Sequence, residues 1–523
     1  MGRFYMKRLS VRQKKWIEKT VAADRSYKKL VYTRFFLCAF LVFLQFCAYV
    51  LGFLWLGTNW LFVNIIFSAI GFLFVLHLFN RTDKPSSKLN WILLMMLFPV
   101  VGVPMYLAFG EGRSVRKMAR KIGDAHTKNE KAFIQISPQN TRVTGNLEYY
   151  LEQRGYPSYT DGDVVYYPSG KEAFAQMIKA LEKAEKYILL EYFIVAGGKM
   201  WKEMLSVLLK KAMQGVKIYV IYDDFGSLLV LPPKYDRYLE SLHENIRCLA
   251  FNRVMPVFSA QVNNRDHRKM TVVDGKVAFT GGMNLADEYI DEKVRFGHWK
   301  DSAVRVTGGA VNSFVFAFFN VYNAYKPVED LSDFLVPCEQ ERSGDVIIPY
   351  DVMPGEKSHV AETVYLEMIN SAKEYLYITT PYLILDDFMR AALCNAAMRG
   401  VDVRIVTPSI PDKKVVFRLT RANYEILMKA GVKIYEYTPG FIHAKNVVSD
   451  GKGIVGTINF DYRSLYLHFE NAVYFTTPSA VEKVKSDFED VFSASALCDE
   501  NMVKSGFFGK LLDSVLRVFE TLL

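Results

Sequence analysis

Two copies of one short arrangement of histidine, lysine and aspartate occur in this chain of 523 residues. Each copy has the pattern His-x-Lys-x4-Asp and is followed by a glycine turn and an asparagine. The members are His267, Lys269, Asp274 and Asn284 in the first copy, and His443, Lys445, Asp450 and Asn459 in the second. Side chains two residues apart lie on one face of a strand, so each copy presents an imidazole and an ammonium side by side. The two copies together would suit a phosphate ester.

A phosphodiester carries a negative charge that repels anionic nucleophiles, whereas a neutral imidazole can attack its phosphorus. A second, protonated imidazole can give its proton to the departing alkoxide. Lys269 and Lys445 would stabilise the charge that grows on the phosphoryl oxygens, and Asn284 and Asn459 would add neutral donors for binding the phosphate. Two lysines leave little need for a cation, and no carboxylate cluster has metal-binding spacing. We therefore expect no metal and no cofactor.

The elements that must position these side chains repeat along the chain. Helical and strand patterns alternate after residue 160, and a capping box opens the first helix at Ser169–Glu172. Predicted strands lie at 187–193, 216–224 and 246–251 before the first copy, and at 375–380, 401–406 and 432–437 before the second. Alternating apolar strands and helices indicate an α/β fold with helices on both faces of each sheet. We expect two tandem α/β/α domains in a pseudo-twofold arrangement, with the active site at their interface.

Two apolar segments near the N-terminus predict a transmembrane helical hairpin. Residues 35–56 contain no charge and, as a helix, would span roughly 33 Å. Residues 60–79 form a second span, separated from the first by only three residues. The basic arm at 1–34 carries eleven Lys and Arg against two acids, and the hairpin tip carries none. The positive-inside rule then places both ends of the hairpin in the cytoplasm. The first span is no cleavable signal peptide, because it is too long and lies behind a basic arm of 34 residues.

A third apolar stretch, 91–109, contains Pro99 and Pro104, which should break a helix midway. Basic residues flank it on both sides. This favours a re-entrant or interfacial segment, with a third full span as the alternative.

The overall charge indicates the class of partner, and the cysteines indicate the redox compartment. The net charge of +10 favours anionic partners, either nucleic acid or an acidic membrane surface. None of the six cysteines forms a CxxC pair or a zinc-type spacing, which indicates free thiols in a reducing compartment.

The predicted organisation has six parts. They are a basic cytoplasmic arm (1–34), a membrane anchor (35–110), a basic linker (111–160), a first domain (161–335), a second domain (336–505) and a C-terminal amphipathic helix (506–523). That helix could pack on the catalytic body or lie in the membrane interface.

The paired motif resembles that of the phospholipase D superfamily. Further blocks make the resemblance specific to bacterial cardiolipin synthases, over nearly the whole chain beyond the basic arm. These blocks are the N-terminal hairpin, the segment from Trp91 to Pro104, Glu191-Tyr192, Trp299-Lys300-Asp301, Thr380-Pro381-Tyr382, Phe441 to Lys445, and Asn459 to Ser464. The resemblance implies two phospholipase D-like domains and the transfer of a phosphatidyl group.

Roles for individual residues follow from the resemblance. It implies that His267 is the nucleophile and His443 the general acid. It also implies that a carboxylate beyond each motif orients an imidazole, and the matching residues are Asp301 and Glu470, 34 and 27 residues after the histidine of their own copy.

The remaining acids would then act at a distance from the substrate. Asp274 and Asp450, although members of the motif, would secure the motif loop. Glu191 would support the site from behind or simply pack, and His298 and His468 are interpreted as structural or supporting residues.

The implied reaction has two steps. A phosphatidyl group moves from phosphatidylglycerol to His267, with release of glycerol, and forms a phosphohistidine. A second phosphatidylglycerol then attacks through its glycerol hydroxyl and gives cardiolipin. Since water competes as an acceptor, the site must lie against the membrane.

The expected partners are phosphatidylglycerol and anionic membrane lipids, without nucleic acid, and a homodimer is left open. The expected location is a bacterial cell membrane, multi-pass, with the catalytic domains on the cytoplasmic side. Alternatives are a hydrolytic phospholipase D, a membrane-tethered nuclease of the same superfamily, and a non-catalytic membrane scaffold. The apolar hairpin, and the lack of a separate basic and aromatic nucleic-acid module in the sequence, argue against the nuclease.

Overall fold

The structure is a computed structural model. It describes residues 25–81, 85–109, 113–138, 145–254, 263–327, 329–338, 344–356, 358–499, 502 and 506–518. Most of the basic arm predicted at 1–34 therefore lies outside the described residues.

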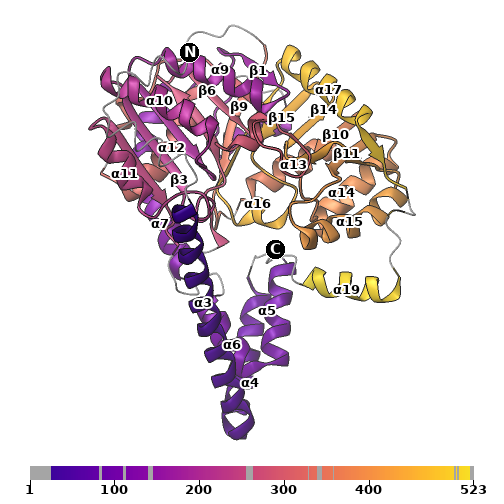
Figure 1. The fold of residues 1–523 in the computed structure, drawn as a ribbon. Helices are drawn as coiled ribbons and strands as arrows, with labels where there is room; N and C mark the ends of the chain where they lie inside the picture. The colour runs from indigo at the N-terminus through magenta and orange to yellow at the C-terminus, as the bar shows by residue number, and fades with distance from the viewer. Residues whose placement is uncertain are drawn as a thin grey trace.

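Two mixed β-sheets form the body of the molecule (Figure 1). The first has the order β1-β8-β6-β5-β2-β3-β4 and the second the order β17-β12-β11-β10-β14-β15-β16-β9. The strands of the first sheet are β1 (Val164–Tyr167), β2 (Tyr187–Tyr192), β3 (Lys217–Asp223), β4 (Ile246–Phe251), β5 (Lys269–Val273), β6 (Val277–Gly281) and β8 (Ala303–Thr307). Those of the second are β9 (Ile347–Val352), β10 (Tyr375–Thr379), β11 (Asp402–Pro408), β12 (Lys433–Tyr437), β14 (Asn446–Ser449), β15 (Lys452–Gly456), β16 (Glu470–Phe475) and β17 (Ser495–Leu497).

The two sheets repeat one topology. In each, three parallel strands are followed by an antiparallel hairpin that begins just after the His-x-Lys pair: β2, β3 and β4 precede β5–β6, and β10, β11 and β12 precede β14–β15. The predicted duplication of an α/β unit is therefore confirmed.

Helices cover the sheets on both faces. The first half contains α9 (Gly170–Glu182), α10 (Lys199–Met213), α11 (Tyr235–Leu242), the short η2 (Asp287–Ile290), α12 (Val311–Tyr325) and the short η3 (Leu331–Asp333). The second contains α13 (Val360–Ser371), α14 (Asp387–Met398), α15 (Lys414–Lys429), α16 (Tyr462–Tyr466) and α17 (Pro478–Ser493). Helix α9 begins as predicted, because the Ser169 hydroxyl accepts a hydrogen bond of 3.2 Å from the Glu172 backbone N–H.

One buried cluster joins the halves. It contains Met270 and Val272 of the first sheet, Val448 and Val455 of the second, and the inner faces of α12 and α17. Separate clusters lie beneath the outer helices of each half. Since apolar burial is the main stabilising term in folding, this shared cluster holds the two repeats in one body.

The residues that precede the first sheet clasp both halves. Helix α7 (Arg113–Ile136) lies along α12, where Phe133 stacks on Phe316 with ring centroids 4.3 Å apart. Helix α8 (Asn146–Gln153) reaches the second half through Glu148, which accepts a hydrogen bond of 2.5 Å from the Tyr474 hydroxyl. The stretch interpreted from sequence as a basic linker thus contains two packed helices.

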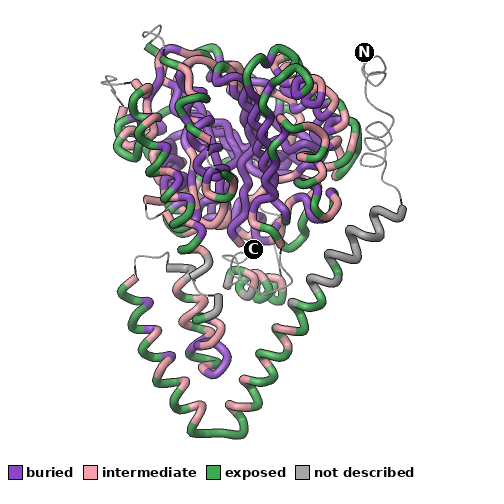
Figure 2. Tube along the Cα trace, turned by 90° about the vertical axis from the view of Figure 1, so that its left-hand side faces the viewer, coloured by how far each residue is buried: buried purple, intermediate pink, exposed green. Residues whose placement is uncertain are grey.

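Four apolar helices project from one side of this body (Figures 1 and 2). They are α3 (Arg25–Asn59), α4 (Leu61–Phe79), α5 (Pro85–Leu97) and α6 (Pro99–Phe109). Among the described residues, α4 is the one helix that is long and apolar enough to cross a membrane, and residues 43–59 of α3 form a shorter apolar stretch. The second predicted span therefore corresponds to α4, whereas a hairpin of two spans is a proposal.

The predicted break in the third apolar stretch falls at Phe98, between α5 and α6. Pro99 starts α6, a position where its missing N–H costs nothing. The expectation that Pro104 also breaks the helix is wrong, since this residue lies inside α6. Helix α6 turns back along α5 so closely that a Cβ on Gly102 would lie 2.7 Å from the Leu94 carbonyl oxygen.

Candidate active site

The histidine of each motif copy is hydrogen-bonded to the opposite half of the molecule. His267 comes just before β5, and its backbone N–H donates a 2.8 Å hydrogen bond to the Phe469 carbonyl. His443 comes just before β14 and donates in the same way to the Lys300 carbonyl at 2.7 Å. A small parallel sheet of β7 (His298–Lys300) and β13 (Gly440–Ile442) reinforces the second crossing. The two motif copies therefore meet at the interface between the halves, as the sequence predicts.

The side chains of the two histidines also contact the opposite half of the molecule. His267 Nδ1 lies 2.9 Å from both carboxylate oxygens of Glu470 at the start of β16. His443 Nδ1 lies 2.8 Å from Asp301 Oδ2, just after β7. Both carboxylates are buried. When Nδ1–H donates to the carboxylate, Nε2 of each ring is left open for substrate chemistry.

Each imidazole contacts one of the two predicted carboxylates, and the pairing is crossed between the copies. Glu470 follows His443 in the chain but contacts His267, and Asp301 follows His267 but contacts His443. The reason is the crossed backbone attachment, which puts the residue after Phe469 beside one ring and the residue after Lys300 beside the other.

The two lysines are buried and lie close to the rings. Lys269 Nζ donates a 2.6 Å hydrogen bond to the His267 carbonyl, and Lys445 Nζ donates to the His443 carbonyl. Burial lowers the pKa of Lys269 to about 8 and that of Lys445 to about 7, against the opposing pull of Glu470 and Asp301. An anionic phosphoryl group between these ammonium groups would restore their charge, so the site suits a phosphate.

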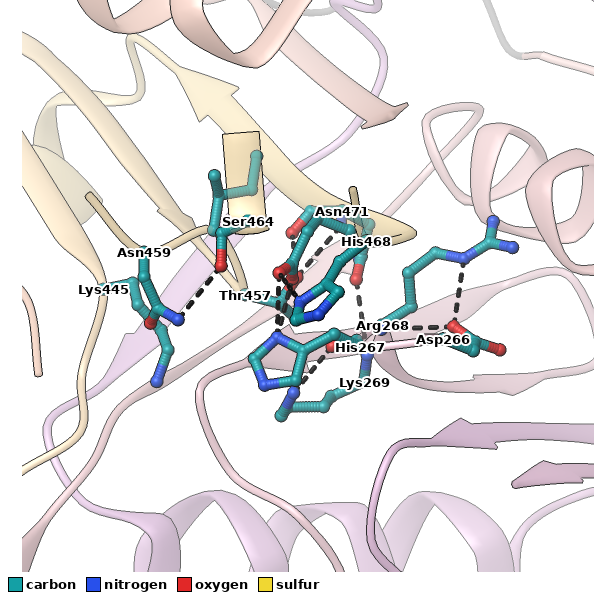
Figure 3. A network of polar contacts seen from close by, with 12 residues as sticks. Asp266, His267, Arg268, Lys269, Lys445, Thr457, Asn459, Ser464, His468 and Asn471 are labelled. Carbon is teal, nitrogen blue, oxygen red and sulfur yellow. Dashed lines mark hydrogen bonds and ion pairs between the residues drawn. The ribbon is translucent and has the colours of Figure 1, made fainter. Parts of the chain in front are cut away.

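The same surroundings keep the imidazoles neutral. Burial first, and then the charge of Lys269, lower the pKa of His267 well below its ordinary value. Burial and Lys445 lower the pKa of His443 to about 4. The ammonium of Lys445, from the other half, also contributes to the lowered pKa of His267. Figure 3 shows Lys445 and Asn459 in the same view as His267 and Lys269.

The carboxylates nevertheless differ between the two half-sites. Burial raises the pKa of Glu470, although Lys269 and the Thr457 hydroxyl oppose the rise. Burial would also raise the pKa of Asp301, but His443 and Lys445 outweigh it, so that this pKa is lowered. The Thr457 hydroxyl donates a 2.5 Å hydrogen bond to Glu470. Its counterpart is Gly282, where a Cβ would lie 2.1 Å from Asp301 Oδ1.

The motif aspartates lie at the far ends of the strands from the histidines, roughly 20 Å along each strand. Asp274 accepts 2.8 Å hydrogen bonds from the backbone N–H groups of Glu185, Lys186 and Tyr187. Asp450 accepts equivalent bonds from the backbone of residues 373–375, the strongest at 2.6 Å from Lys373. Both aspartates have a left-handed backbone at the hairpin turn. They fix the motif hairpins to β2 and β10 and contact no reacting atom.

The two asparagines predicted to bind phosphate are engaged within the protein. Asn284 donates a 2.7 Å hydrogen bond to the Tyr289 hydroxyl and accepts one of 3.0 Å from the Ile194 backbone N–H. Asn459 donates to the Ser464 hydroxyl at 3.0 Å. Each amide nitrogen carries a second hydrogen, so a contact with substrate stays a prediction.

Glu191 lies behind the site. Its carboxylate is 3.1 Å from the guanidinium of Arg268, which also faces Asp266 at 3.6 Å and Asp351 at 3.2 Å. Arg268 stands between His267 and Lys269 in the chain and points to the opposite side of the strand (Figure 3). This buried ion cluster holds the first motif from behind. Sequence reasoning missed Arg268, although a charged residue between two active-site residues could have signalled a charged partner behind them.

The aromatic and histidine neighbours of the two rings also differ. His468 lies 5.6 Å from the His267 ring, and its Nδ1 is 3.6 Å from Glu470. Trp299 occupies the matching place, 5.4 Å from the His443 ring, and Tyr289 is 5.6 Å from that ring. His298, by contrast, bonds the Tyr437 hydroxyl at 2.8 Å, outside the site.

One group among the described residues, His267, His468 and Glu470, has ligand types and separations that a metal ion would need. The lysine and arginine charges around it oppose a cation: burial first, and then the charges of Arg463, Lys269 and Arg265, lower the pKa of His468. The same charges favour a phosphate anion.

Family models for known proteins match both halves of the body, including the regions that carry the two motif copies. Residues 177–295 and 365–492 match the family model described as "Cardiolipin synthase, PLD-like domain". Residues 60–111 match the model "Phospholipase_D-nuclease N-terminal". A solved structure, phosphatidylserine synthase from Haemophilus influenzae, superposes with a TM-score of 0.56 at 14% identity, covering 72% of this chain and 100% of that chain. At that identity the likeness shows the fold alone.

Relatives match along nearly their whole length. An "Uncharacterized protein" of Streptococcus mutans is 40% identical, covering 86% of this chain and 99% of that protein. A "Cardiolipin synthase" of Geobacillus kaustophilus is 34% identical, covering 88% and 92%. One of Alkalihalophilus pseudofirmus is 31% identical, covering 88% and 94%. Because both halves match one domain model and the relatives match from end to end, this chain belongs to the cardiolipin synthase family of phospholipase D-like proteins.

Proposed function

We propose that this protein is a cardiolipin synthase that transfers a phosphatidyl group from one phosphatidylglycerol to another, through a phosphohistidine on His267. One observation carries the proposal: two imidazoles, each held at Nδ1 by a buried carboxylate from the other half, share one site with two buried lysines. This arrangement suits in-line displacement at a phosphodiester.

In the first step, Nε2 of neutral His267 attacks phosphorus, and the bond from phosphorus to the glycerol oxygen breaks. The proton for the departing glycerol comes from His443. Although the pKa of this group is about 4 without substrate, an anionic phosphodiester beside it would raise that pKa, and Asp301 would stabilise the imidazolium. Lys269 and Lys445 would hold the phosphoryl oxygens throughout.

In the second step, the hydroxyl of another phosphatidylglycerol gives its proton to His443. Its oxygen then bonds to phosphorus as the bond to His267 Nε2 breaks. One phosphodiester replaces another, so atoms and charge balance without a nucleotide. Water in place of the lipid alcohol would give phosphatidic acid, which is the hydrolytic alternative.

The test is product analysis with the full chain reconstituted in phosphatidylglycerol vesicles. Wild type should give cardiolipin and glycerol, and His267→Ala and His443→Ala should give neither. His243→Ala is a matched control, because His243 follows α11 and its ring accepts a local hydrogen bond of 3.1 Å from the Asn245 backbone N–H. Phosphatidic acid as the main product would favour hydrolysis, and full activity of His267→Ala would exclude the proposed nucleophile.

We also propose that α3 and α4 form a membrane hairpin, with the body on the cytoplasmic side. The uncharged turn at Trp60, the apolar surface of α4 and the basic residues at 1–34 support this orientation. Helices α5 and α6 would then form the re-entrant segment. Accessibility of the tip to an impermeant reagent measures the orientation.

A further inference from the structure

The C-terminal helix α19 (Phe507–Val518) has one face attached to the body and one face exposed. Its attachment is polar and specific: Arg418 of α15 bonds Asp513 at 2.5 Å and the Gly509 carbonyl at 2.9 Å, and Arg517 bonds the Ala422 carbonyl at 2.9 Å. Leu516 packs beside Ile384, Val416 and Leu419. These contacts fix the rotation of the helix about its own axis.

The fixed rotation turns four large apolar side chains outward. Phe507 and Phe508 are 78% and 82% exposed, and Leu511 and Leu512 are 54% and 46% exposed. At these spacings the four side chains form one continuous face of the helix. A contiguous apolar face that does not serve to attach the helix marks an interaction surface.

We infer that this exposed face of α19 inserts into the surface of the anionic bilayer that supplies the substrate and seats the mouth of the active site on it. The inference rests on the proposed function for its substrate. It goes beyond anchoring by α3 and α4, because it gives the second half its own contact with lipid.

The position of α19 supports a lipid occupant. Figure 1 shows the helix on the side of the body from which α4–α6 project, and Figure 2, turned by 90°, shows it beneath the body on that same side. Basic residues lie on the helix at Lys510 and Arg517 and at the start of α15 at Lys413 and Lys414, while Asp412 and Asp513 pair with Lys413 and Arg418. A patch that combines phenylalanine and leucine with lysine and arginine suits an anionic lipid surface.

Helix α19 also lies close to the reacting groups. Leu516 packs against the same small cluster as Tyr382, whose hydroxyl bonds Asp412 at 2.7 Å and receives a 2.8 Å bond from Lys413. Ile384 of that cluster donates a 2.9 Å backbone hydrogen bond to the carbonyl of Phe460, the residue that follows Asn459 of the second motif copy.

The first half presents a comparable rim. Phe225, Leu229 and Val230 follow β3 and are 40%, 47% and 39% exposed. They lie at the edge of the sheet where His267 precedes β5, because the end of β2 pairs with the start of β5 at Tyr192 and Lys269. Phe225 stacks on Arg265, which lies two residues before His267. Apolar residues therefore border the site on both sides, as expected where a lipid enters.

The first test measures contact with lipid independently of turnover. A fluorescent non-natural amino acid replaces Phe508 in the full chain carrying His267→Ala, and the protein is reconstituted in phosphatidylglycerol vesicles that contain lipid with a nitroxide on the acyl chain. We expect strong quenching at 508 and none at the control position Met213, which is 60% exposed at the end of α10. No quenching at 508, or contact between labels on two copies of the chain, would overturn the inference.

The second test measures activity. Phe507→Ser, Phe508→Ser, Leu511→Ser and Leu512→Ser are combined, with Met213→Ser as the matched control. Cardiolipin formation should fall several-fold in vesicles yet equal wild type in detergent–lipid micelles, where no bilayer surface has to be engaged. Equal rates in vesicles, or an equal loss in micelles, would contradict the inference. If wild type made no cardiolipin while 508 was still quenched, the proposed function would fail and the lipid contact would stand.

Discussion

At the scale of single residues, the site depends on groups whose charge is set by burial. Its lysines have lowered pKa values because they are desolvated, and its histidines are kept neutral for the same reason and by the neighbouring lysines. The site is thus prepared for an anion before the anion arrives, which is the condition for electrostatic catalysis.

These pKa values predict a bell-shaped dependence of kcat/KM on pH. On the acid side, activity is lost when His267 becomes protonated, and its lowered pKa puts that limb below pH 6.5. On the alkaline side, the decline begins early because His443, whose pKa is about 4, must carry a proton, and it steepens at about 7, where Lys445 loses its proton, and at about 8, where Lys269 does. Steady-state rates on phosphatidylglycerol micelles from pH 5 to pH 9 measure both limbs.

Lys445→Arg separates the two lysines. A guanidinium stays charged in this range, so the steepening at about 7 should disappear and the one set by Lys269, at about 8, should remain. A steepening that persisted at about 7 would mean that a group other than Lys445 causes it.

At the scale of elements, the sequence predicts which segments become strands, but it does not predict which residues of the two halves contact each other. The predicted strands at 187–193, 375–380 and 432–437 are observed as β2, β10 and β12 within one or two residues. Their apolar runs and capping residues are local signals. The crossed carboxylates are not local: Glu470 and Asp301 could be named from the resemblance, but their partners depend on how the halves face each other.

Two sequence predictions about helices fail because they depend on contacts with distant parts of the chain. Pro104 remains inside α6 because tertiary contacts of α6 with α4 and α5 outweigh the local preference to end a helix. Residues 113–136 looked like a charged linker, although Ile122 and Phe133 face a core that belongs mostly to later parts of the chain. Local patterns carry no record of such partners.

The return of α6 along α5 gives an elemental prediction. In Gly102→Ala the new Cβ would meet the Leu94 carbonyl and the Met95 backbone at 2.7–2.8 Å, neither of which can rotate away. Overpacking of this kind costs about 1–3 kcal/mol, so the thermal midpoint of the anchor in detergent should fall. Gly52→Ala is the control, since nothing lies within 4 Å of its added Cβ. An equal midpoint for both variants would show that the two helices separate easily.

At the scale of the whole molecule, the body and the apolar helices form two regions with different solvents. The body buries its apolar side chains in three large clusters, whereas α3 and α4 display theirs outward, as with Phe62 at 70% and Leu73 at 64% exposure. Such surfaces suit lipid, and in the proposed membrane hairpin their position on one side of the body sets which side faces the bilayer.

The orientation predicts which positions an impermeant thiol reagent can reach in intact cells. A cysteine introduced at Thr58, at the end of α3, should react from outside, because the proposed hairpin has both of its ends in the cytoplasm. A cysteine introduced at Lys452, in the β14–β15 hairpin of the body, should react only after the membrane is permeabilised. The opposite labelling pattern would show that the body lies outside the cell and the hairpin tip inside.

The exchange of carboxylates between the halves has a consequence for how such a duplicated enzyme can change. A lesion at Glu470 strips support from a ring encoded about two hundred residues upstream, and one at Asp301 does the same downstream. Neither repeat can therefore lose its carboxylate by mutation while the other repeat keeps a supported histidine. Evolution must conserve both repeats together.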